Sequence, residues 1–199
     1  MPHSLLFIPD ISGFTRFVNE SEVQHGRHVV AELLEVLFSS DQLGMSVAEI
    51  EGDAILFFLP DRVPELGEIV QQAARTFRSF HTHLKSFERD RICECGACSG
   101  VQGLSLKFVA HAGPIETLRV REFAKPFGRD VIVAHRLLKN DVPDDEYLLV
   151  TEPWLGEDAA LPEWARLARG ETDYADVGRI RHGHVPLAPL RAGVPDPPA

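Results

Sequence analysis

The alternation of hydrophobic and polar residues predicts a chain of interleaved strands and helices. Residues 4–8 (SLLFI) are apolar throughout, as in a buried strand, whereas hydrophobic residues at helical spacing predict a helix over about residues 22–39. Residues 45–60 contain two strand patterns around a tight EGD turn, which indicates a hairpin. The clearest helical pattern covers residues 64–87 and has a proline near its start.

The second half of the chain predicts further strands and helices. Residues 104–113 alternate as a strand, and the segment PIETLRVREF after them is expected to pair back as another strand. Helices are expected at residues 128–140 and 161–169, with a strand at residues 146–151 between them. This order indicates an α+β sandwich of ferredoxin-like (βαββαβ) type, in which one mixed, mostly antiparallel sheet carries helices on one face.

Length and charge narrow the class of protein. The chain has 199 residues, and neither a repeat nor a linker divides it. We therefore expect a single domain over residues 1–192, with a cysteine-containing insert at about 90–100 and a disordered tail at 193–199. The formal net charge of −10 argues against nonspecific binding to nucleic acids or anionic membranes. No apolar run approaches the roughly 20 residues of a membrane span, and no secretory signal is present, so we expect a cytoplasmic protein.

Two aspartates stand where predicted strands end. Asp10 ends the first buried strand, and Asp53 lies in the turn of the hairpin. If these strands are neighbours in one sheet, both carboxylates emerge at the same edge, where a cation between them relieves their repulsion. Hard ions such as Mg²⁺ use these oxygen ligands together with substrate phosphates, and the turn at Gly13, Phe14 and Thr15 can direct backbone N–H groups at an anion. The pattern predicts a metal–triphosphate site, although either aspartate alone is more typical of a turn or cap.

Four segments, in this order, resemble blocks of the class III nucleotidyl (adenylate or guanylate) cyclase catalytic domain: FIPDISGFTRFV, AEIEGDAILFF, FVAHAGPIE and FGRDVIVAHRLL. The resemblance covers about residues 4–151, and a last segment, DVGRIRHGHVPLAPL, resembles the family more weakly. It implies a head-to-tail homodimer with active sites at the interface, a purine nucleoside triphosphate as ligand, and Mg²⁺ or Mn²⁺ as cofactor. Because the chain begins on the first block, we expect no sensor domain before it.

The resemblance also assigns roles to residues. By position, Asp10 and Asp53 would bind the metals, with the carbonyl of Ile11 as a further ligand. Two metal ions would activate the ribose 3′-hydroxyl and stabilise the leaving pyrophosphate. The transition-state arginine matches Arg136, which would brace a phosphate of the partner chain's nucleotide; a solvated or salt-bridged helix arginine is the alternative. His111, in the third block, is expected to be structural, at a strand end.

Three positions depart from the family. Its base-reading lysine is replaced by Glu49, and its second base-reading position, usually Asp or Thr, is Lys125. The exchanged charges either read a different base edge or form a structural salt bridge. The transition-state asparagine is replaced by Ile132, and losing one such hydrogen bond typically costs about 3 kcal/mol, or roughly a hundredfold in rate. We therefore expect slow or atypical cyclisation of a purine nucleotide, or a catalytically lapsed module that binds a nucleotide or another ligand.

The three cysteines form a second candidate metal site. Cys93, Cys95 and Cys98 have the spacing C-x-C-x-x-C, which favours Zn²⁺ or a related soft metal. A structural zinc ion needs four ligands, so His81, His83 or a residue of a partner chain would complete the set. Reduced thiols without a metal, or a stray disulfide, are the alternatives. If zinc binds and the nucleotide does not, the protein is a small metal-stapled interaction domain.

Overall fold

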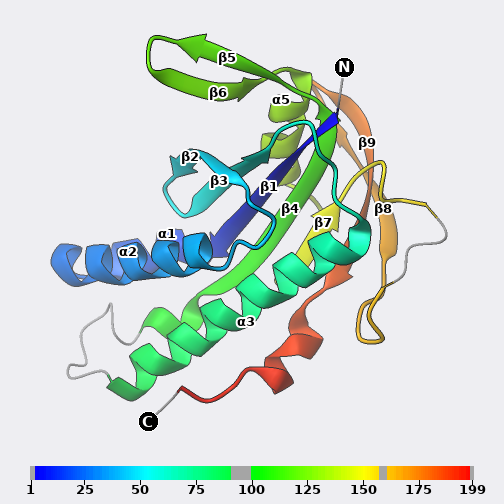
Figure 1. Cartoon of the computed structure of the whole chain (residues 1–199). Helices are drawn as coiled ribbons and strands as arrows, with labels where there is room; N and C mark the ends of the chain where they lie inside the picture. The colour runs from blue at the N-terminus through cyan, green and yellow to red at the C-terminus, as the bar shows by residue number, and fades with distance from the viewer. Residues whose placement is uncertain (1–2, 91–99, 157–160, 198–199) are drawn as a thin grey trace.

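The computed structural model describes residues 3–90, 100–156 and 161–197. Within them, seven strands form one sheet, and two further strands form a separate hairpin (Figure 1). In spatial order, the strands of the main sheet are β2 (Ser46–Glu51), β3 (Ala54–Leu59), β1 (His3–Ser12), β4 (Ser105–Pro114), β7 (Tyr147–Val150), β9 (Gly178–Pro186) and β8 (Ala168–Tyr174). Neighbouring strands are antiparallel except β4 and β7, which are parallel. The predicted α+β class with a mixed, mostly antiparallel sheet is confirmed.

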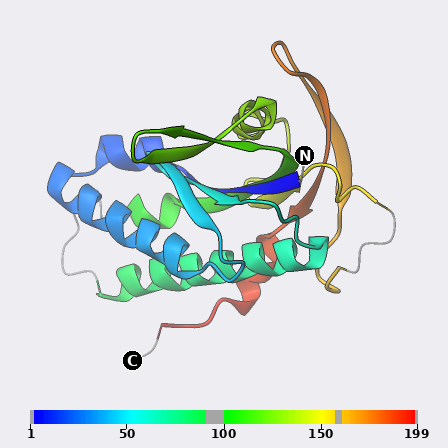
Figure 2. The same cartoon turned by 45° about the horizontal axis from the view of Figure 1, so that its top comes forward.

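Helices cover both faces of the sheet, so the prediction of helices on one face is wrong for α5. The helical elements are α1 (Phe14–Glu20), α2 (Val23–Ser39), α3 (Leu66–Asp90), η1 (Val101–Gly103), α5 (Arg129–Leu137) and η2 (Ala188–Gly193). Figure 2 shows α2 and α3 on one side of the sheet and α5 on the other. The buried stripe of α5 requires an apolar surface of its own. Within the described residues, no helix combines the length and apolar composition that crossing a membrane requires.

Alternation along β1 supplies an apolar surface to each helical layer. Leu5 and Phe7 belong to the core beneath α2 and α3, whereas Leu6 and Ile8 belong to a second core beneath α5. Because both faces of the strand are buried, apolar residues follow one another in its sequence and do not alternate with polar residues. Asp10 follows this run on the face of the second core, and this places its carboxylate on the α5 side of the sheet.

The segment after β4 does not pair back on β4, so that prediction is wrong. It forms β5 (Glu116–Val120), which pairs antiparallel with β6 (Phe123–Phe127) in a separate hairpin. The physical reason is that β4 already has β1 on one edge and β7 on the other, so neither edge is open to a further strand. The hairpin extends from the body of the molecule (Figure 1).

The predicted helix at residues 161–169 is also wrong. Its end is part of β8, which pairs with β9 and so completes the sheet. Gly170 permits this pairing, because a Cβ there would lie 2.9 Å from Cε1 of His182. The described chain continues through η2 to residue 197, and in this stretch Val194 is buried and its carbonyl oxygen accepts a 2.8 Å hydrogen bond from Lys85 Nζ.

Candidate functional site

Asp10 and Asp53 lie side by side at one end of the sheet because β1 and β3 are paired. Asp10 is opposite Ala54 in the ladder, and the backbone N–H of Ile11 donates a 3.1 Å hydrogen bond to the carbonyl oxygen of Asp53. Both aspartates are partly buried. Burial raises the pKa of Asp53, and the charge of Asp10 raises it further. The fold therefore brings together the two carboxylates that the sequence points to.

Lys107 adds a positive charge to this pair, and sequence reasoning missed it. It faces Asp10 across the β1–β4 ladder, and its Nζ lies 3.3 Å from Asp10 Oδ2. Its charge also opposes the upward shift of the Asp53 pKa. The available signal was a single lysine within the strand pattern LSLKFVA, on the same side of the strand as the buried Val109. Two carboxylates and one ammonium group leave an excess of negative charge.

The turn after β1 depends on Gly13, whose φ is 85°. A Cβ at this position would lie 2.5 Å from the carbonyl oxygen of Gly103, so a side chain does not fit. Phe14 begins α1, and its ring lies 4.0 Å from the position of a Cβ built on Gly52 in the β2–β3 turn. Thr15 is exposed. The turn thus lies beside the aspartates, and its contact with a phosphate stays a prediction.

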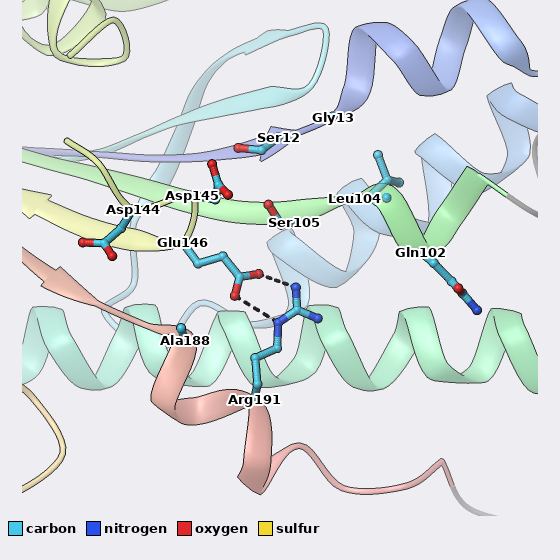
Figure 3. A pocket seen from close by; sticks show the side chains of 11 residues that line it. Ser12, Gly13, Gln102, Leu104, Ser105, Asp144, Asp145, Glu146, Ala188 and Arg191 are labelled. Carbon is cyan, nitrogen blue, oxygen red and sulfur yellow. Dashed lines mark hydrogen bonds and ion pairs between the residues drawn. The ribbon is translucent and has the colours of Figure 1, made fainter. Parts of the chain in front are cut away.

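An open pocket of about 510 Å³ lies next to this turn (Figure 3). Ser12, Ser105 and Asp145 lie around one part of it, and the ion pair between Glu146 and Arg191 lies around another (Figure 3). Arg191 Nε donates a 3.0 Å hydrogen bond to Glu146 Oε2, and Nη2 contacts the other carboxylate oxygen. Burial raises the pKa of Glu146, but the contact with His81 and the hydrogen bonds from Arg191 outweigh it, so the pKa is lowered.

His111 anchors α5 to the sheet, as predicted for a structural histidine. It is buried, with Nδ1 2.6 Å from Thr151 Oγ1 and Nε2 3.0 Å from Asp130 Oδ1. The hydrogen bond with His111 lowers the pKa of Asp130. Asp130 is in the first turn of α5, so this contact positions the helix that carries Ile132 and Arg136.

Ile132 and Arg136 lie four residues apart on the exposed side of α5. The Ile132 side chain is exposed. Arg136 donates hydrogen bonds to Asp176 Oδ2 from Nε at 2.7 Å and from Nη2 at 2.6 Å. Arg136 is therefore a salt-bridged helix arginine in the single chain, the alternative considered from the sequence. Helix α5 lies on the same face of the sheet as Asp10.

Glu49 and Lys125 do not pair within one chain. Glu49 is exposed on β2. One of its carboxylate oxygens, one carboxylate oxygen of Glu51 and one ring nitrogen of His135 all lie within 4.8 Å of one another. Lys125 is exposed on β6, whose hairpin contacts β2. Among the described residues no ion pair joins Glu49 to Lys125, so the structural salt bridge is absent from the single chain.

Cys93, Cys95 and Cys98 lie outside the described residues, so the predicted zinc site stays a prediction. The two histidines expected to complete it contact carboxylates elsewhere. His81 is buried, with Nε2 3.2 Å from Glu146 Oε1, and His83 Nε2 lies 3.1 Å from Glu32 Oε2.

Solved structures that superpose on this chain include catalytic domains of nucleotide cyclases. The chain superposes on the catalytic core of a rhodopsin-guanylyl cyclase with converted specificity in complex with ATPαS, with TM-score 0.63 and 13% identity over 92% of this chain and 95% of that one. It superposes on the guanylyl cyclase Cya2 with TM-score 0.61 and 14% identity over 92% and 91%. The adenylyl cyclase CyaB from P. aeruginosa gives TM-score 0.55 and 14% identity over 92% and 94%. At these identities the likeness establishes the fold, and the expected cyclase-like architecture is confirmed.

Sequence comparison gives a relative and a family. The uncharacterized protein Rv2561/Rv2562 of Mycobacterium tuberculosis (strain ATCC 25618 / H37Rv) is 35% identical over 132 residues, which are 62% of this chain and 57% of that protein. The chain thus spans little more than half the length of this relative. The family model described as protein of unknown function (DUF2652) matches residues 30–147, more than half of the chain. On this match, and with a cyclase-like fold around Asp10 and Asp53, the chain belongs to the DUF2652 family.

Proposed function

We propose that this protein binds a metal–guanosine triphosphate complex at Asp10 and Asp53 and slowly cyclises the nucleotide to its 3′,5′-cyclic product. The observation that supports the proposal is the pair of partly buried carboxylates from neighbouring strands, with the ammonium group of Lys107 beside them. Their charge exceeds that of the lysine, so the site favours a further cation. The oxygen donors suit Mg²⁺ or Mn²⁺ rather than a soft metal.

The groups around the aspartates fit a metal-bound triphosphate. Asp10, Asp53 and the carbonyl of Ile11 would hold the metal, which when bound supplies charge neutralisation and activation of the ribose 3′-hydroxyl. Lys107, on the neighbouring strand, would bind a phosphate oxygen by a charge-assisted hydrogen bond. The turn at Gly13 would approach the phosphates with its backbone, since it carries no side chain there.

The charges at the base-reading positions favour guanine over adenine. An ionised glutamate only accepts hydrogen bonds and a lysine only donates them. Guanine presents adjacent N–H donors and a carbonyl acceptor on the same edge, which suits Glu49 and Lys125 together. Adenine presents an unprotonated ring nitrogen where guanine has an N–H, so the Glu49 carboxylate would meet a lone pair.

One face of the β5–β6 hairpin fits the interface of a homodimer. Cross-strand partners share a face of a hairpin, so the register places Glu116, Leu118 and Val120 on one face with Phe127, Lys125 and Phe123. All four apolar side chains are exposed in the single chain. An exposed apolar face is a protein-interaction surface, and a lysine at its centre would be carried to the partner's base-binding position.

A nucleotide-binding module without catalysis is the second candidate. Ile132 favours it, because an exposed aliphatic side chain at the asparagine position provides no hydrogen bond to the ribose. Under this proposal the metal and the nucleotide still bind, and only the cyclic product is missing.

The test is incubation of the protein with Mn²⁺ and each of ATP, GTP, CTP and UTP, with mass spectrometry of the products and calorimetry of nucleotide binding. Asp10→Asn keeps the side-chain volume and removes the charge, and Asp173→Asn, on the exposed β8–β9 hairpin, is the matched control. We expect cyclic GMP from the wild type and Asp173→Asn, and none from Asp10→Asn. Binding of Mn²⁺–GTP without product would select the module. A folded wild type that binds no nucleotide would contradict both candidates.

A further inference from the structure

The turn between β8 and β9 contacts the exposed side of α5 at two arginines. Arg129 Nη2 donates a 2.7 Å hydrogen bond to the carbonyl oxygen of Val177. Asp176, the residue before Val177, accepts both hydrogen bonds of Arg136 on a single carboxylate oxygen. The two arginines lie on either side of Ile132 along the helix. The turn is thus placed against the side of α5 that carries Arg136, the match to the family's transition-state arginine.

Packing holds this turn in position. Tyr174, Val177 and Ile180, on both sides of the turn, pack against the second hydrophobic core. The packed turn therefore holds the Asp176 carboxylate beside Arg136.

We propose that Asp176 is a positioning residue that holds Arg136 away from the partner's nucleotide until the triphosphate displaces it. This inference rests on the proposed function, because Arg136 acts on the nucleotide only in that reading. The guanidinium is satisfied within its own chain by one carboxylate, and the triphosphate offers the same kind of acceptor with more charge. The two anions compete for one guanidinium.

The ion pair between Arg136 and Asp176 is weak enough for the triphosphate to displace it. The side chains of Arg136 and Asp176 are 47% and 43% exposed, and ion pairs so open to water are weak. Removing the carboxylate therefore makes Arg136 more available without exposing a buried charge. Since the triphosphate must displace Asp176 before Arg136 can act on it, the change belongs in kcat/KM.

The test is a comparison of Asp176→Asn with the wild type, in steady-state kinetics with Mn²⁺ and GTP. We expect kcat/KM to rise about twofold to fivefold, as removal of a weak exposed ion pair predicts. Asp173→Asn removes a carboxylate from the same hairpin that pairs with Arg179, and it should leave kcat/KM unchanged. Asp176→Asn should have no effect in an Arg136→Ala background. An unchanged or lower kcat/KM in Asp176→Asn, or a rise that persists without Arg136, would overturn the inference.

A second measurement separates this inference from the proposed function. The Nε–H signal of Arg136, identified by its loss in Arg136→Lys, is followed by ¹⁵N NMR during titration with inorganic tripolyphosphate. We expect the shift to occur at roughly twofold to fivefold lower concentration in Asp176→Asn than in the wild type or Asp173→Asn. Equal midpoints, or an Arg136 signal that does not respond in any variant, would reject the competition. Failure of the proposed function would instead be seen as absence of nucleotide binding, whatever the tripolyphosphate result.

Discussion

Lys107 is a positively charged residue beside two carboxylates. Like Lys107, Glu146 forms an ion pair with a residue on a distant element. Lys107 on β4 meets Asp10 on β1, and Glu146 near β7 meets Arg191 in η2. From sequence, Asp10 and Asp53 were identified by their place after strands. Lys107 and Arg191 were not, because the partner of a charge is set by which strands and helices become neighbours.

The buried histidine of α3 should make stability depend on pH. Burial lowers the pKa of His81 from its ordinary value of 6.5 in the folded protein. Between the two pKa values the unfolded chain binds a proton that the folded protein does not. The free energy of unfolding therefore falls as the pH decreases through and below 6.5, and is recovered above it. Glu146, whose pKa is lowered, loses its stabilising contribution in the same direction at lower pH.

The measurement is the melting temperature between pH 8 and pH 5, as conventional buffers allow, for the wild type and His81→Gln. We expect a smaller decrease on acidification in His81→Gln, because glutamine does not titrate. His3→Gln, at an exposed position, is the control and should retain the wild-type decrease. Parallel curves for the wild type and His81→Gln would show that another group is responsible, with the buried His182 as the first to examine.

At the scale of elements, the turns determine which side chains lie together at the ends of the strands. The β1–α1 turn needs a left-handed residue, and it also needs no side chain because the η1 backbone lies against it. Sequence alone identified this turn. The close approach of Gly103 was not predictable, since η1 is about ninety residues further along the chain and reaches the turn only through the β1–β4 pairing.

Gly13→Ala should therefore destabilise the protein more than a glycine substitution that introduces only backbone strain. Gly44 has φ 73° and open space around a built Cβ, so Gly44→Ala should cost about 1–2 kcal/mol for the left-handed backbone alone. Gly13→Ala adds the clash with Gly103, and we expect a loss larger than that of Gly44→Ala. Urea unfolding of both variants measures the difference. Equal losses would mean that η1 moves aside at no cost.

For the whole molecule, the exposed face of the β5–β6 hairpin predicts self-association. Phe123 is 70% exposed and Phe127 is 60% exposed in the single chain, and burying a phenylalanine is worth about 1.5–3 kcal/mol. We expect the double substitution Phe123→Ser, Phe127→Ser to weaken dimerisation at least tenfold, as measured by analytical ultracentrifugation with Mn²⁺ and GTP. Val23→Ser, at an 86% exposed position on α2, is the control and should leave the dimer intact. A wild type that stays monomeric at high concentration would contradict an interface active site.

The sequence by itself determined the elements whose signals are local. Periodicity identified the helices that became α2, α3 and α5, and the strand patterns placed Asp10 near the end of one strand and Asp53 in the turn between two others. Tertiary structure alone decided that β5 leaves the sheet, that residues from 168 form a strand rather than a helix, that Lys107 joins the aspartates and that Asp176 holds Arg136. The physical reason is that each of these depends on an open sheet edge or on a charge contributed by a distant element. Such a partner exists only after the chain has folded.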